Sequence, residues 1–153
     1  MSTLDKYRKL QNKFNLPQLS ELKSTFKFEL DSEDEIFDQI RIEMSERLFT
    51  FTERILEPIV SGAESYSSLL EQDMMTREDR LEIFQMYKKV QALKWENNLL
   101  MITPNEKETA RWIKKVWTFW NDELGGMLTR ICKQMSSGWK DLTIKDEKTI
   151  YHG

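Results

Sequence analysis

The chain has almost none of the residues on which most catalytic and redox chemistry depends. Its 153 residues include one histidine, His152, and one cysteine, Cys132. A single histidine beside the C-terminus provides no basis for a Ser-His-Asp triad or a histidine-based metal site. A single cysteine excludes an internal disulfide framework and is typical of a reducing compartment. Because Cys132 lies among Leu128, Ile131 and Met135, we expect it to be a small buried hydrophobe.

Helix breakers and long apolar runs are also scarce, with only five glycines and three prolines. No stretch approaches the roughly 18 apolar residues of a membrane span, and the N-terminus carries no secretory signal. Phosphate-binding glycine loops, CxxC and GxSxG motifs are missing from the sequence, so we expect no cofactor. Apolar residues make up 39% and charged residues 32%, which favours long amphipathic helices. We therefore predict an all-α protein of the cytoplasm.

The net charge of −3 is unevenly distributed along the chain. Residues 1–28 carry six bases and two acids, residues 29–99 carry eight bases and 17 acids, and residues 100–153 carry nine bases and seven acids. Solvated helix faces explain most such patterns, but the basic ends could also dock onto the acidic middle or present a bipolar surface. A pI near 5.4 argues against a dedicated nucleic-acid binder.

Apolar spacing predicts a helical bundle of three long helices with shorter N-terminal and connecting helices. We expect one domain over residues 1–142 and a flexible tail over residues 143–153. The first short helix ends near Phe14, and the second begins at Pro17. The predicted long helices cover about 33–57, where Pro58 kinks or ends the helix, about 77–101, and 104 onward.

Capping signals set the starts of these three helices. Ser32 with Glu35 forms a capping box, and Thr76 with Asp79 forms a weaker one. Thr103 is the expected N-cap of the third helix, with proline at its first position. Within the second helix, Asn97 interrupts the apolar stripe, so we expect a buried polar contact or a frayed end there.

The segment from Thr103 to Trp139 contains four of the five tryptophans. At 100° per residue, one apolar arc keeps its phase through Gly125-Gly126, which favours a continuous helix over a C-cap at Gly125. We expect this arc to be core, and its members are Ala110, Ile113, Trp117, Trp120, Leu124, Leu128, Ile131, Met135 and Trp139.

A second arc, formed by Trp112, Val116 and Phe119, lies roughly 100° from the first. A helix with two apolar sides either buries both or offers one to a partner. The arc could belong to the core of a central helix, form a protein interface, or stack on bases. Our functional hypothesis is an interface that binds a protein partner or a second copy. The charged rim of this interface would be Arg111, Lys115 and Asp122.

Two further hypotheses follow from the charged residues. The basic ends suggest an RNA- or ribosome-associated protein. Four carboxylates at i,i+3 spacing, Glu35 with Asp38 and Glu43 with Glu46, suggest a weak Mg²⁺ site. Paired Glu-x-x-Glu and Glu-x-x-Asp motifs resemble those of all-α nucleoside triphosphate pyrophosphatases, but the second pair here does not follow the first at a suitable distance. A non-enzymatic protein is therefore favoured over this enzyme.

The segments KYRKLQNKFNLPQLSEL and LEIFQMYKKVQALKW resemble a group of small uncharacterised all-helical proteins from archaea. The resemblance extends over most of the chain. It implies a cytoplasmic helical protein, and it implies no activity and no functional residue.

Overall fold

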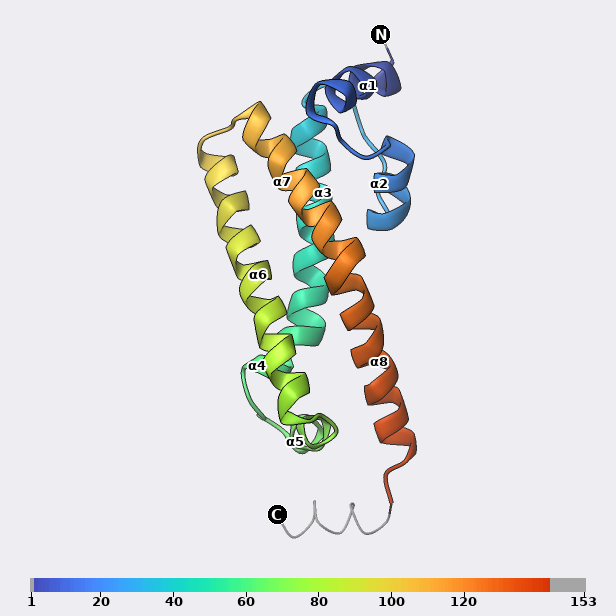
Figure 1. The fold of residues 1–153 in the computed structure, drawn as a ribbon, viewed down its shortest axis with the longest axis vertical. Coiled ribbons are helices and arrows are strands. Elements are labelled where there is room, and N and C mark those ends of the chain that lie inside the picture. Colours follow the sequence, from blue (N-terminus) through green and yellow to red (C-terminus); the bar gives the residue numbers. More distant parts are fainter. Residues whose placement is uncertain (1, 144–153) are drawn as a thin grey trace.

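A computed structural model describes residues 2–143, and these residues form helices and turns with no strand (Figure 1). The predicted all-α class is confirmed. Three long helical stretches run along the molecule. The first consists of α3 (Ile36–Phe51), the π-helical segment η1 (Thr52–Leu56) and the short helix α4 (Glu57–Val60), and the second is α6 (Arg77–Ile102) alone. The third consists of α7 (Glu106–Phe119), the π-helical segment η2 (Trp120–Leu124) and α8 (Gly125–Lys140).

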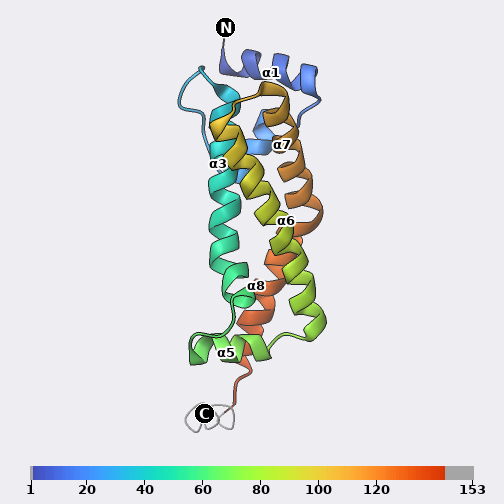
Figure 2. The same cartoon turned by 90° about the vertical axis from the view of Figure 1, so that its left-hand side faces the viewer.

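Three short helices complete the bundle (Figures 1 and 2). At one end lies α1 (Thr3–Phe14), with α2 (Leu19–Phe26) beside α3 and α7 near that end, and at the other end lies α5 (Tyr66–Asp73). The turn between α1 and α2 is held by Tyr7, whose buried hydroxyl donates to the Pro17 carbonyl oxygen at 2.5 Å. Burial raises the pKa of Tyr7 well above its ordinary value, and the Glu21 carboxylate raises it further.

The helix starts agree only in part with the capping signals. Thr76 and Asp79 form the expected capping box. Ser32 does not cap α3, because Glu35 adopts a left-handed backbone conformation (φ 51°) and the helix begins at the next residue. Thr103 instead ends α6, and the Asn105 side chain accepts the backbone N–H of the third residue of α7. The predictions of caps at Ser32 and Thr103 were wrong, because the Ser32 hydroxyl instead accepts the Asp34 backbone N–H in a local turn and the Thr103 backbone N–H is bonded to the Leu99 carbonyl oxygen of α6.

The predicted continuity through Gly125-Gly126 is confirmed, since α7, η2 and α8 form one uninterrupted stretch. The π-helical turn brings the Trp120 carbonyl oxygen towards Gly125, where an added Cβ would lie 2.9 Å from that oxygen. Glycine at this position therefore permits the π turn. Gly126 has open space around the same position. Pro58, in turn, lies in the first turn of α4, so the helical path continues past it to Val60.

Buried apolar side chains from α1, α2, α3, α6, α7 and α8 form one cluster along the bundle. A polar contact is embedded in it, as expected at Asn97. The Asn97 side-chain oxygen accepts a hydrogen bond from the Arg41 guanidinium at 2.5 Å, and both residues are buried. Because a buried charge needs a hydrogen-bond partner, the contact between Arg41 and Asn97 stabilises the packing of α3 against α6.

Two predictions near the C-terminus have different outcomes. Cys132 is exposed on α8, so the prediction of a buried cysteine was wrong. Leu128 and Ile131 face the core, and Cys132 is rotated about 100° from Ile131 towards a side that no other helix covers. The predicted flexible tail lies, apart from residue 143, outside the described residues.

Candidate protein-docking surface

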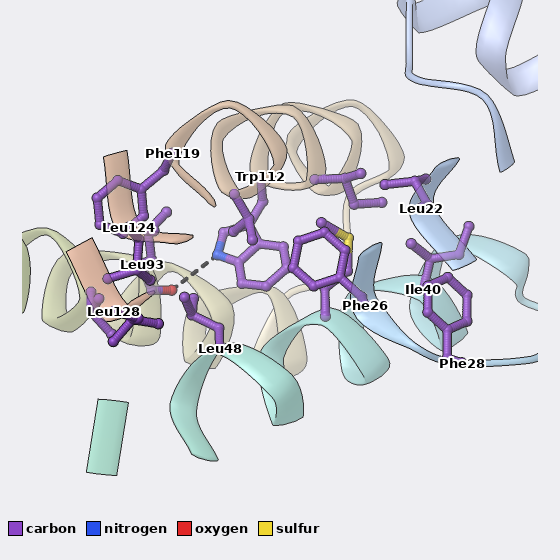
Figure 3. Packing of buried hydrophobic residues seen from close by; sticks show 14 of the residues in the cluster. Leu22, Phe26, Phe28, Ile40, Leu48, Leu93, Trp112, Phe119, Leu124 and Leu128 are labelled. Carbon is purple, nitrogen blue, oxygen red and sulfur yellow. Dashed lines mark hydrogen bonds between the residues drawn. The ribbon is translucent and has the colours of Figure 1, made fainter. Parts of the chain in front are cut away.

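The tryptophan-rich helix buries its second apolar arc completely and most of its first arc at least in part. Trp112, Val116 and Phe119 of the second arc have exposed fractions of 2%, 0% and 6%. The Trp112 indole N–H donates to the Leu93 carbonyl oxygen at 3.0 Å (Figure 3), so this arc packs against α6. Of the three alternatives for this arc, the core of a central helix is confirmed, and the interface and base-stacking hypotheses were wrong for these residues, because α6 already covers them.

The first arc packs against the opposite elements. Trp117 and Trp120 lie against the Phe26 ring of α2, with ring centroids 6.4 and 5.4 Å away, and Trp120 also contacts Phe51 of α3 at 5.9 Å. Trp139, at the end of this arc, is 40% exposed, and its indole N–H donates to a Glu71 carboxylate oxygen at 2.9 Å. Its predicted place in the core was wrong, because Trp139 lies in the last turn of α8, beside the short helix α5 rather than between the long helices.

The predicted charged rim lies at the surface. Arg111, Lys115 and Asp122 are exposed, and Lys115 pairs with Glu96 of α6 at 3.3 Å. Arg111 pairs with Glu108 of its own helix at 3.1 Å. Arg111 and Lys115 border a groove of about 430 Å³ between α6 and α7, whose lining also includes Leu99, Leu100 and Trp112.

The apolar surface without a partner lies on α6. Of the eleven exposed large apolar side chains among residues 2–143, six belong to this helix. Four of them are largely uncovered: Trp95 is 68% exposed, Leu99 is 62% exposed, Met101 is 63% exposed and Ile102 is 81% exposed. We call Leu81, Phe84, Lys88, Trp95, Leu99 and Ile102 the outer stripe.

The outer stripe runs straight along the whole of α6. At 100° per residue, its members fall within an arc of about 60°, on the side opposite the buried residues. The buried stripe of the same helix is Ile83, Val90, Leu93, Asn97 and Leu100. In Figure 1, α6 lies at the edge of the molecule, and the turned view of Figure 2 shows it in front of the bundle. The feature expected of α7, a helix with one unpartnered apolar side, therefore belongs to α6.

The four candidate metal ligands do not assemble a site. Among residues 2–143, no group of three or more acidic, histidine or cysteine side chains is placed to hold a metal ion. Asp38 lies 3.9 Å from the buried Arg41 guanidinium, and Glu35 and Glu46 are exposed. Burial raises the pKa of Glu43, and the carboxylates of Glu46 and Asp31 raise it further. The structure therefore gives no support to the Mg²⁺ hypothesis.

Bases from both ends of the chain are paired with acids of the middle. Lys6 lies 3.5 Å from Glu33, and Arg130 lies 2.9 Å from Glu82. These pairs agree with docking of the basic ends onto the acidic middle. They also neutralise cations that an RNA-binding surface would need.

No described helix has the length and apolar character needed to cross a bilayer. Comparison with known protein families, with curated proteins and with solved structures finds no match to the chain. The resemblance to archaeal helical proteins therefore stays a prediction.

Proposed function

We propose that the protein is a non-enzymatic interaction module that binds an α-helix of a protein partner along the outer stripe of α6. The observation that carries this proposal is the exposure of Trp95, Leu99 and Ile102 on one side of an edge helix. Helices that pack along their length contact each other through apolar side chains spaced three and four residues apart. Aromatic residues are also enriched among the side chains that dominate binding energies.

The size of the apolar surface supports a contact of this kind. If each large side chain can expose roughly 200 Å², the five apolar members of the outer stripe expose on the order of 600 Å². The largest apolar patch of an ordinary monomer is about 300–600 Å², and a patch of that size is often functional. A specific interface buries about 800 Å² of accessible surface on each partner. The outer stripe together with its polar flanks is therefore large enough to bind one helix.

A photo-crosslinking amino acid at Leu99 tests the proposal in the native cell. We expect covalent adducts to form from this position, because the partner helix would cover it. The matched control is the same amino acid at Lys133, which is exposed on α8 and rotated about 200° from the buried Ile131. Adducts at equal yield from both positions, or none from Leu99, would overturn the proposal.

We also propose a cytoplasmic location, supported by the single cysteine and its exposure on α8. RNA binding has less support, because the cations that border the α6–α7 groove, Arg111 and Lys115, both lie in ion pairs. An enzymatic function has no cluster of groups to support it among the described residues.

A further inference from the structure

We infer that the helix bound by the outer stripe is α6 of a second copy of the chain, packed antiparallel about a twofold axis. This inference rests on the proposed function and specifies its partner. It is drawn from the order of side chains along the stripe. The steps from Leu81 through Phe84 to Lys88 are three and four residues, and the steps from Trp95 through Leu99 to Ile102 are four and three.

The stripe is therefore symmetric about a point between Gln91 and Ala92. A twofold axis through that point places each residue of α6 opposite the residue of the second copy that lies equally far on the other side of the axis. Phe84 then faces Leu99 of the second copy, and Leu81 faces Ile102 in the same way. Both pairs are apolar, and each occurs twice in the dimer.

The same operation matches the one cation of the stripe with its largest aromatic ring. Lys88 faces Trp95 of the second copy, and an ammonium group over an indole face is a favourable cation–π contact. Without the second copy, Lys88 interrupts the apolar stripe. In the dimer its charge has a partner, and its aliphatic stem adds to the buried surface.

The centre of the stripe permits the two helices to approach. Gln91 and Ala92 lie beside the axis, and the small Ala92 side chain is exposed. In Figure 1 α6 forms one side of the bundle, and in Figure 2 no other helix lies in front of it. Two stripes together bury on the order of 1,200 Å², which is at the lower limit for a stable specific interface. A reversible dimer is therefore expected. An unrelated partner helix would need no such symmetry in its binding site.

Charge substitutions at the paired positions test the register. Phe84→Lys alone and Leu99→Glu alone each place a charge against an apolar side chain twice, so each should self-associate at least about tenfold more weakly than wild type. When the two variants are mixed, one interface contains a Lys–Glu pair and an unchanged Leu–Phe pair. We expect sedimentation analysis to show that the mixture recovers a dimer that neither variant forms alone. Lys133→Glu, on α8, should dimerise like wild type.

A second measurement does not depend on charged variants. Ala92→Cys, in a chain whose exposed Cys132 is replaced by serine, should be joined efficiently to a second copy by a short bis-maleimide. Far-ultraviolet circular dichroism confirms that each variant is folded. A wild-type chain that stays monomeric at all accessible concentrations would overturn the inference. If the photo-crosslinking amino acid at Leu99 then forms adducts whose mass differs from that of two copies of the chain, the proposed function is still supported. A wild-type dimer whose mixed variants stay monomeric and whose Ala92→Cys chain does not cross-link would also overturn it.

Discussion

Replacing Trp112 by alanine should destabilise the monomer strongly, whereas replacing Trp95 by alanine should leave its stability almost unchanged. Trp112 is 2% exposed, and its indole N–H is hydrogen-bonded to the Leu93 carbonyl oxygen at 3.0 Å. Trp112→Ala leaves a large cavity between α6 and α7, and we expect it to lower the free energy of unfolding by about 3–5 kcal/mol. Trp95 is 68% exposed, so Trp95→Ala should change that free energy by no more than about 0.5 kcal/mol.

Urea unfolding followed by far-ultraviolet circular dichroism measures both effects. The protein should be dilute enough to be monomeric, because loss of Trp95 would otherwise also remove stability contributed by the dimer. Trp112→Phe provides an intermediate variant, since it keeps an aromatic ring but removes the hydrogen bond, which is worth about 0.5–1.5 kcal/mol. Equal destabilisation by Trp112→Ala and Trp95→Ala would refute the assignment of one tryptophan to the core and the other to the surface.

Two further predictions concern the backbone and pH. Gly125→Ala should destabilise the protein by about 1–3 kcal/mol, because the new Cβ would lie 2.9 Å from a backbone carbonyl oxygen. Gly126→Ala should instead stabilise the protein by about 0.5–1 kcal/mol. Thermal unfolding compares the two variants, and a shift of the melting temperature in the same direction for both would contradict the π-turn explanation. Hydrogen bonds from the Thr76 backbone and the Gln134 side chain lower the pKa of Asp79, so its stabilising contribution is present above its ordinary pKa and is lost as pH falls through the lowered value. Urea midpoints measured from neutral to acidic pH should therefore fall less steeply for Asp79→Asn than for wild type, and parallel curves would contradict the prediction.

The three long helices could be predicted from the sequence because the period of apolar residues depends only on local geometry. Continuity through Gly125 followed from phase alone, and the polar contact at Asn97 followed from one interruption of an apolar stripe. Helix starts were less predictable. Ser32 and Thr103 are good capping residues, yet Glu35 and Asn105 occupy the N-cap positions, because the path of each loop decides which residue comes first in the helix.

The docking surface was assigned to the wrong helix. An amphipathic pattern shows how many apolar sides a helix has, but not which neighbour covers each side. The short helix α2 supplies Phe26 against Trp117 and Trp120, so α7 becomes central and α6 remains at the edge. A sequence signal for the outer stripe was present in the spacing of the apolar residues of α6, although Lys88 interrupts it.

Hydroxyl-radical footprinting of the purified protein at low and high concentration tests the central claim most directly, because it reports the exposure of individual side chains. The account predicts that Trp95, Leu99 and Ile102 are oxidised in dilute protein and become protected as concentration rises, while Trp112 stays protected throughout. Oxidation of Trp112 in dilute folded protein, or protection of Trp95 that does not change with concentration, would contradict it.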